Sequence, residues 1–557
     1  MGEDKIKVKV IDKKTGEVKD FYKEFIEHLK MKKDFWLRDC IVEGDINIFD
    51  IYMKIKEKIK DKNRIRELIT KREDNKGTIM EINIDIFIHI DNVEFKGNFI
   101  SYNNNISRNI ETIKTIFKNS IVFGNSIFEK DIVFMESTFE GLSIFGNLTF
   151  KGKVDFSKAI FKKKAEFSGL IFEKETFFNN TKFNNIVFEK TIFKSITKFD
   201  DIEFELLIFS ECIFEYISHF KNKQSDRGFA VFYKCSFGHK EVIIENFLLS
   251  RTSFLKTDVR DVLILCDTEN NKILSHEILN FKECILIKEV DEELDKIISG
   301  ECNNYDNLML KLQKLFEIEK EKPYDLTIIF ITKVLPKLRL SLKRIIKKRI
   351  IDVIILKREI NSKKLKLIVS INIPITFRML FIYLYLKIYK SLEKLDERYR
   401  YIYKIIAKDL NYKSVLAEYR NLRLSIENNR TYVEASELFK KEMELIKEKS
   451  GIFEKIIIWF YGKISNYGES IFMPFFWTIY VIFVTPFIVL DLNYMLGNFP
   501  QDYTYTNCLF DTLRAFFQLG IKDNDSLMYN YEWLIRIISL ILLGNIFIAI
   551  KRRLERK

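Results

Sequence analysis

The sequence predicts a multidomain membrane protein: an N-terminal β-helical solenoid, an α-helical linker, and a C-terminal α-helical domain with two membrane spans. Three observations predict this fold class. Phe recurs at every fifth or sixth residue between positions 117 and 220, a basic stretch rich in Leu and Ile fills the middle of the chain, and two long apolar segments lie near the C-terminus.

The composition excludes several classes of protein. With 557 residues, 47% hydrophobic and 31% charged, the chain is neither disordered nor buried in lipid throughout. Its net charge of +13 suits an anionic membrane surface or nucleic acid equally well. The seven Cys are odd in number and form no CxxC pair, which disfavours a zinc ribbon and a disulfide framework and indicates a reduced, cytosolic environment. The polar stretch Met1–Lys9 predicts no secretory signal peptide.

The Phe repeat is the strongest signal for the first half of the chain. Of the 21 Phe from Phe117 to Phe220, all but Phe177 form a series of twenty in which each follows the last by five or six residues. Neither the helical nor the strand period produces such spacing, so it indicates a repeating supersecondary unit. A step of five that returns each ring to the interior fits a square-sided β-helix with Phe stacked between coils. Small or β-branched residues two positions before the Phe would fill the corners: Ser126, Ser137, Ala159, Ala165, Thr176, Thr191 and Thr197.

The alternating steps of five and six in KVDFSKAIFKKKAEFSGLIFEKETFF (153–178) resemble the eleven-residue variant of the pentapeptide-repeat family. That resemblance implies a right-handed quadrilateral β-helix over 1–290, clearest at 90–220. Cys40–Asp50 resembles an opening coil and Phe229–Val262 resembles the terminal coils, with a helical insertion at about 51–78.

The solenoid Phe side chains are expected to form core, so none is assigned to a ligand. Some pentapeptide-repeat proteins mimic DNA through a strongly acidic surface. Here residues 117–220 carry 13 Lys against 15 Asp and Glu, a net charge of −2, which supports such mimicry poorly. The flat faces of the solenoid are instead expected to bind a protein partner.

Two segments are predicted to span a membrane, at 471–490 and 533–550, because each is long and apolar enough to cross a hydrocarbon core of about 30 Å. Trp459, Trp477 and Trp533 would lie in the aromatic belts. Basic residues precede the first span and follow the second, whereas the loop between them carries six acidic residues against two basic ones. The positive-inside rule therefore predicts a multi-pass protein of the cell membrane with both termini in the cytoplasm.

The stretch 507–523 between the spans is predicted to be a short helix followed by a loop. This plan resembles the pore domain of potassium channels, whose filter reads T-x-G-Y-G-D. Leu519, Gly520 and Asp523 match that pattern, whereas Ile521 replaces Tyr and Lys522 replaces the second Gly. Lys522 removes a Gly-permitted backbone conformation and adds an ammonium near the ion path, which makes K⁺ selectivity doubtful and favours anions or poor selectivity. A loop that conducts nothing is the alternative.

The order of the parts resembles the family that joins pentapeptide repeats to a two-span channel-like domain. Segments 416–450, 453–477 and 531–557 carry this resemblance, which implies an ion-channel-like protein with a cytosolic sensor or interaction domain. Two spans enclose no pore alone, so a homotetramer in the lipid bilayer is expected, and the permeant ion is unknown. A non-conducting membrane-anchored scaffold and a membrane-depolarising stress or phage-defence effector remain alternatives.

The predicted linker, 291–465, precedes the channel-like domain at 466–557. Its segment 333–366 holds 13 basic residues against Asp352 and Glu359. Contact with anionic lipid is expected there, with a solvated face or nucleic acid as alternatives, and nucleic acid is disfavoured because base-stacking aromatic residues are absent. The membrane-surface candidates are Lys343, Arg344, Lys347, Lys348 and Arg349.

Two further helical features are predicted in the linker. Segment 367–386 is apolar but contains Arg378, so a buried or interfacial helix is preferred to a third span. Residues 401–450 should form paired amphipathic helices that couple the solenoid to the spans.

No catalytic constellation is found. The five His are scattered, and no HExxH, GxSxG, GxGxxG or GxxxxGK[ST] motif is present. The sequence therefore predicts that the protein is not an enzyme, with no catalytic residues, no metal site and no cofactor.

Overall fold

The structure is a computed structural model that describes residues 7–74, 77–224, 227–238, 241–267, 272–280, 397–496, 504–521 and 526–555. The basic candidates at 343–349, the segment 367–386 and two filter residues, Lys522 and Asp523, lie outside these ranges. The chain divides into two compact units, residues 1–274 with 411–557, and residues 275–410. Within the second unit the described helical residues are 275–280 and α9 (Glu397–Ile406).

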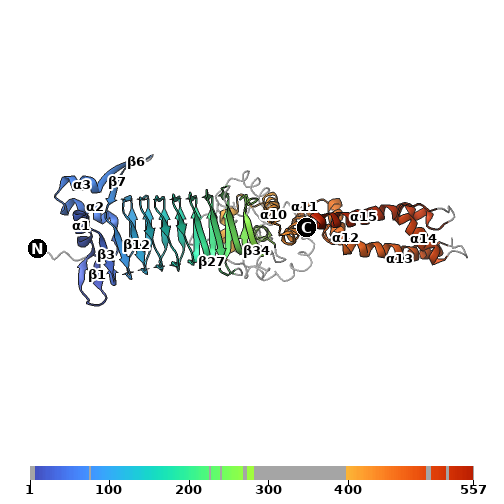
Figure 1. Cartoon of the computed structure of the whole chain (residues 1–557), viewed down its shortest axis with the longest axis horizontal. Helices are drawn as coiled ribbons and strands as arrows, with labels where there is room; N and C mark the ends of the chain where they lie inside the picture. Colours follow the sequence, from blue (N-terminus) through green and yellow to red (C-terminus); the bar gives the residue numbers. More distant parts are fainter. Residues whose placement is uncertain are drawn as a thin grey trace, which may run out of the picture. The chain divides into compact units, whose positions relative to one another are not determined.

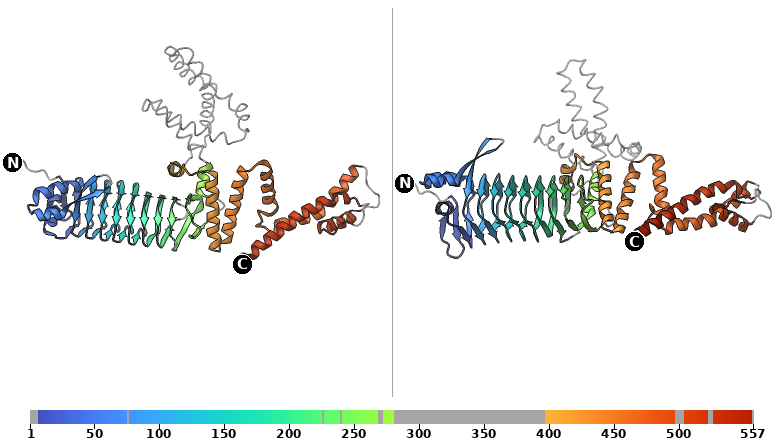
Figure 2. Two further views of the ribbon diagram at one scale, coloured as in Figure 1. Left: turned by 90° about the horizontal axis from the view of Figure 1, so that it is seen from above. Right: turned by 45° about the horizontal axis from the view of Figure 1, so that its top comes forward.

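The first unit contains a four-sided β-solenoid of about eight turns, as predicted (Figure 1). Each coil contributes one short strand to each side, and strands of successive coils pair in parallel about 22 residues apart, as in Ile121 with Ser143. The spacing is 21 residues between Phe167 and Phe188 and 23 between Phe209 and Phe232. Figure 2 shows the same stack of strands from two further sides.

The four sides are built from strands that recur in chain order. The first side contains β5 (Ile46–Asn47), β10 (Phe99–Tyr102), β14 (Ile121–Gly124), β18 (Ser143–Gly146), β22 (Ala165–Ser168), β25 (Lys182–Glu189), β27 (Thr197–Ser210), β30 (Phe229–Tyr233) and β33 (Thr252–Ser253). The second contains β6 (Ile69–Asp74), β7 (Gly77–Ile84), β11 (Asn104–Ile106), β15 (Ile127–Phe128), β19 (Thr149–Phe150), β23 (Ile171–Phe172), β26 (Ile192–Phe193), β28 (Ile213–Phe214) and β31 (Ser236–Phe237).

The long strands β25 and β27 turn corners of the coil, so that β25 belongs to the first and fourth sides and β27 to the first, third and fourth sides. The third side contains β3 (Phe35–Arg38), β8 (Ile88–Asp91), β12 (Ile110–Ile113), β16 (Ile132–Val133), β20 (Val154–Asp155), β24 (Thr176–Phe177), β29 (Ser218–Asn222), β32 (Val242–Leu248) and β34 (Leu263–Asp267). The fourth contains β4 (Cys40–Glu43), β9 (Glu94–Phe95), β13 (Ile116–Phe117), β17 (Thr138–Phe139) and β21 (Ile160–Phe161).

The Phe repeat forms the core, as expected. All twenty rings of the repeat from Phe117 to Phe220 are buried, and they form ladders along the solenoid. In one ladder, the ring of Phe167 stacks on those of Phe145 and Phe188 at centroid distances of 4.7 and 4.8 Å. These distances equal the spacing of paired strands, about 4.8 Å. The small residues predicted for the corners are buried as well.

The backbone explains the eleven-residue period. Every second corner is turned by a residue in the left-handed conformation, with φ between 49° and 59° at Asn103, Lys114, Asn125, Glu136, Asn147 and Lys158. Asn tolerates this conformation better than most residues, which suits it to half of these corners. The eleven-residue sequence repeat therefore corresponds to two sides of the coil together with one left-handed corner.

The N-terminal end of the solenoid is covered by α1 (Phe21–Met31), which follows the hairpin β1 (Lys9–Asp12) and β2 (Val18–Asp20). Asp20 begins the helix by accepting a hydrogen bond from the backbone N–H of Lys23. One face of α1 is buried: Phe21, Tyr22, Phe25, Ile26 and Leu29. This helix shields the open edge of the first coil, which would otherwise offer unpaired backbone groups to other chains.

The helical insertion predicted at about 51–78 is correct only in its first part. Residues 48–58 form α2 (Ile48–Lys58) and 62–68 form α3 (Lys62–Leu68), but β6 and β7 then make an antiparallel hairpin. The run Ile69–Thr70 is β-branched and favours a strand. In addition, β7 pairs with β11, where Ile82 lies opposite Asn104. This pairing is long-range, so the local sequence does not predict it.

A buried Arg ties this insertion to the first coils. The guanidinium of Arg64 donates two hydrogen bonds of 2.7 Å to the carboxylate of Asp85 and one of 3.1 Å to the carbonyl of Leu29. Burial raises the pKa of Asp85, but hydrogen bonds and the charge of Arg64 outweigh it, so the pKa lies below its ordinary value. The pair therefore stabilises the fold above about pH 4, where Asp85 is also ionised in the unfolded chain.

We expect this stabilisation to be lost as the pH falls through the lowered pKa of Asp85. Asp85→Asn should lower the denaturation midpoint, followed by circular dichroism, at about pH 7, and the difference from wild type should shrink towards about pH 3. A difference that stays constant over this range would contradict the assignment.

The C-terminal end of the solenoid is closed by α10 (Tyr412–Asn428), which pairs with α11 (Tyr432–Lys449) as the predicted amphipathic hairpin. The buried carboxylate of Glu418 accepts a hydrogen bond of 2.6 Å from the backbone N–H of Phe254. The hydroxyl of Ser425 donates one of 2.7 Å to the carbonyl of Val262. These bonds join the last coils to the helical region.

Glu418→Ala should destabilise this junction by about 1–3 kcal/mol, because the N–H of Phe254 would be left buried without an acceptor. Glu418→Gln retains an acceptor oxygen and should lose less. The rate at which a protease cleaves between the solenoid and α10 measures both effects, and equal rates for the two variants would contradict the role of this hydrogen bond.

Candidate functional site: the loop between two apolar helices

Among the residues that the structure describes, two helices are long and apolar enough to cross a membrane, α13 (Phe472–Met495) and α15 (Glu532–Glu555). They contain the first predicted span, 471–490, from residue 472 onward and the whole of the second, 533–550. Only 28% of the apolar stretch of α13 is buried. In the segment Tyr529–Leu554, which comprises η4 (Tyr529–Tyr531) and α15 up to Leu554, the buried share of the apolar stretch is 22%. Large side chains such as Phe476, Phe487 and Phe547 are exposed by 60–68%. The core helix of a soluble protein would bury such side chains.

Between these helices lies α14 (Tyr505–Phe516), as Figure 1 shows. Its 12 residues reach about 18 Å, too short to cross a bilayer. Cys508, Ala515 and Phe516 of α14 are fully buried in an apolar core shared with both long helices, whose contributions are Ile482, Val489, Ile535 and Leu542. The short helix is therefore inserted beside the apolar stretches of α13 and α15.

The chain leaves α14 through a tight turn. Gln518 and Gly520 adopt the left-handed conformation with φ of 63° and 73°, and the N–H of Leu519 donates to the carbonyl of Arg514 at 2.8 Å. Gly520 suits its position because a Cβ there would be strained and would lie 3.1 Å from Nη2 of Arg536. The Arg514 side chain holds the turn, since its Nε donates to the carbonyl of Gly520 at 3.1 Å.

Polar side chains from α14 and α15 converge on this turn. The amide of Gln518 donates to the hydroxyl of Ser539 at 2.8 Å and to the carbonyl of Arg536 at 3.2 Å. Arg536 forms an ion pair with Glu532 one turn earlier on α15. Within the described part of the chain, Arg514 makes no ion pair. The arrangement thus places two guanidinium groups beside the loop, one of them balanced by a carboxylate.

The predicted filter residues are only partly brought together. Leu519 is 71% exposed, Ile521 packs on the apolar core, and the carbonyl of Gly520 accepts from Arg514. Lys522 and Asp523 lie outside the described residues. Sequence reasoning missed the loop-ordering roles of Arg514, Gln518 and Arg536. Charged residues at the borders of apolar segments are the signal that could have indicated them.

A second polar contact lies at the far end of α15. The Nη1 atom of Arg552 donates to the carbonyl of Tyr467 at 2.9 Å and to the carboxylate of Glu469 at 3.0 Å. The same guanidinium lies 4.9 Å from the ring centroid of Phe439 on α11. Arg552 therefore connects the second apolar helix to the entry of the first and to the hairpin that closes the solenoid.

A known protein resembles the chain over almost its full length. The uncharacterized protein MJ1147 of Methanocaldococcus jannaschii is 38% identical to the chain over 574 residues, which cover 99% of each protein. The chain belongs to the family of MJ1147. No protein-family model matches the chain, and no solved structure matches it.

Because the match covers both proteins almost completely, it includes the solenoid, the helical hairpin and both apolar helices. The MJ1147 family therefore combines these parts in one polypeptide.

Proposed function

We propose that the protein is an oligomeric ion channel of the cytoplasmic membrane, not selective for K⁺, whose cytosolic solenoid senses or binds a partner. The insertion of α14 and its turn between two candidate spans is the observation that carries this proposal. Irregular backbone at membrane depth is tolerated only where protein buries it or where it lines a water-filled cavity. A short helix and an ordered turn between two spans fit that condition, and four copies around one axis would place the turns together.

The charges beside the loop support a preference for anions. Arg514 and Arg536 adjoin the turn, and Lys522 follows it in the sequence. Basic side chains around a pore favour anions, whereas a K⁺ filter needs inward-facing carbonyls. The carbonyl of Gly520 is held by Arg514 instead.

A series of contacts that connects the solenoid to the candidate spans supports the sensor role. Glu418 bonds the last coils to α10, α10 pairs with α11, and Phe439 of α11 contacts Arg552 of α15. In this proposal, a partner on the solenoid biases the hairpin and thereby α15. The termini are placed in the cytoplasm on the charge asymmetry of the sequence. No enzymatic activity is part of the proposal.

Ion flux from liposomes containing the purified protein tests the proposal. We expect Cl⁻ flux at least equal to that of K⁺ and Na⁺, and we expect Lys522→Glu, more than Lys522→Gly, to shift selectivity towards cations. Selectivity that does not respond to position 522 would show that this loop does not line the path. Absence of flux for all three ions, with the spans inserted, would favour the membrane-anchored scaffold.

A further inference from the structure

The helix before the first span carries an exposed apolar face. This helix, α12 (Ile452–Ser465), presents six large side chains to the outside: Ile452 (80% exposed), Phe453 (84%), Ile456 (49%), Ile457 (61%), Trp459 (46%) and Phe460 (50%). At 3.6 residues per turn they cover one continuous arc of about 160°. Ile458 and Ser465, on the opposite side, are buried against the protein. The helix therefore has a protein-facing side and a wide apolar side without a partner in the described part of the chain.

Neither water nor a membrane-spanning position suits α12. A patch of this size is rare on a soluble surface, where it marks an interaction site. The 14 residues reach about 21 Å, less than the hydrocarbon core of about 30 Å. A helix with a wide exposed apolar face and insufficient length to span is typical of the plane of the membrane interface.

The connection to α13 places α12 at the membrane boundary. Three successive residues in the left-handed conformation, Asn466, Tyr467 and Gly468, separate the two helices by a tight turn. Nε1 of Trp477, in the second turn of α13, donates to the carbonyl of Lys463 near the end of α12 at 3.2 Å. The end of α12 is therefore held beside the beginning of the first candidate span, and its apolar face continues the lipid-facing surface.

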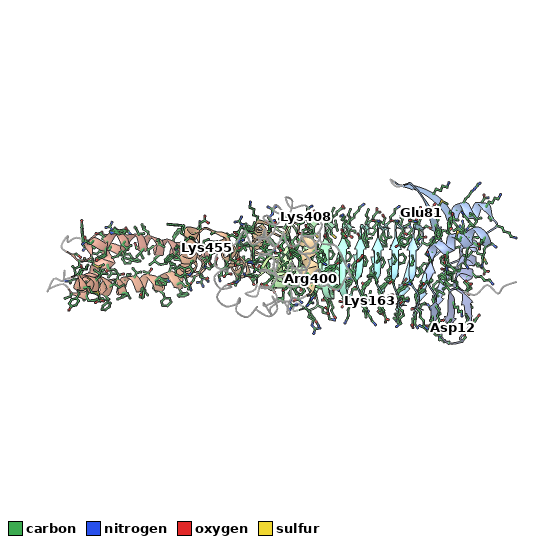
Figure 3. The ribbon with its side chains drawn as sticks, turned by 180° about the vertical axis from the view of Figure 1, so that it is seen from behind. Asp12, Glu81, Lys163, Arg400, Lys408 and Lys455 are labelled. Atoms are coloured by element: carbon green, nitrogen blue, oxygen red, sulfur yellow. The ribbon has the colours of Figure 1, made fainter. Side chains whose placement is uncertain are left out.

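The polar residues of α12 match a lipid surface. Lys455, labelled in Figure 3, and Lys463 lie on this helix, with Glu454 as its one acidic residue. Lys side chains at such a position reach phosphate groups while their stems cover apolar surface, and Trp459 and Tyr461 are residue types enriched at membrane interfaces.

We propose that α12 lies in the plane of the membrane, with its apolar face among the acyl chains near the headgroups and its Lys side chains on anionic lipid phosphates. The proposal rests on the membrane insertion of α13 and α15. It adds a lipid-binding surface next to the beginning of the first span, at the junction that Arg552 also contacts.

Quenching of single Trp residues by brominated lipids tests this proposal in the full-length protein in liposomes. Each of three variants retains one Trp and carries Trp→Phe at the other three positions. Trp459 reports on α12, Trp533 on the start of α15, and Trp36, which is 55% exposed on the solenoid, is the water-facing control. We expect Trp459 to be quenched about twofold or more by lipids brominated near the headgroup, more than by lipids brominated near the chain ends, and Trp36 to be unaffected.

The outcomes separate this proposal from the one on which it rests. Quenching of Trp533 without quenching of Trp459 would overturn the position of α12, and would indicate that protein, such as a second copy of the chain, covers its apolar face. No quenching of Trp533 would overturn membrane insertion itself. As a second check, Phe453→Ser combined with Ile457→Ser should reduce quenching of Trp459 and leave that of Trp533 unchanged, and unchanged quenching of Trp459 would contradict the assigned face.

Discussion

Phe167→Ala is expected to destabilise the solenoid by about 3–5 kcal/mol, the range for truncation of a buried aromatic residue. Its ring is 1% exposed and is stacked between Phe145 and Phe188. It also meets the edges of Phe156 and Phe178 at 5.8 and 5.9 Å. Alanine would leave a cavity in the middle of the ladder, which neighbouring rings held by their own coils cannot fill.

The effect should spread beyond one coil, because each coil of a solenoid contacts only its neighbours and a weak coil in the middle divides the stack. Chemical denaturation followed by circular dichroism measures the loss. Phe49→Ala is the matched control, since Phe49 is 64% exposed and its truncation should change stability by about 0.5 kcal/mol or less. Equal midpoints for the two variants would contradict a core built from stacked Phe.

Arg514→Gln is expected to have the largest effect on conduction. The substitution removes a positive charge beside the loop and the hydrogen bond from Nε to the carbonyl of Gly520. If copies of this loop surround the ion path, the ratio of Cl⁻ to K⁺ permeability should fall by roughly tenfold, equivalent to about 1.4 kcal/mol. Liposome flux with salt gradients of both ions measures this ratio.

Arg514→Lys separates charge from hydrogen bonding. Lys retains the charge but lacks the planar group that donates to the turn, so selectivity should be preserved while the turn is held less firmly. The same loss of anion preference in both variants would show that loop geometry, and not charge, sets selectivity. An unchanged ratio in both would place Arg514 away from the ion path.

Several features could be predicted from the sequence because they depend on periodic burial. A Phe at every fifth or sixth residue is the pattern of a coil in which each side points one residue inward. This pattern alone predicts the solenoid and its Phe core. The two apolar helices and the hairpin formed by α10 and α11 follow in the same way from length and amphipathic pattern.

Contacts between residues that are distant in sequence could not be predicted in this way and became apparent only in the folded structure. The sequence predicts a helix up to about residue 78, whereas β6 and β7 form a hairpin from residue 69, because the pairing of β7 with β11 depends on coil geometry. The hydrogen bonds from Gln518 to Ser539 and from Arg552 to Tyr467 connect parts of the helical region that lie far apart in the sequence. The apolar face of α12 could be interpreted as core until the fold left it exposed. A repeating pattern determines which residues are buried in every coil, whereas a single contact between separate segments depends on how the whole chain brings them together.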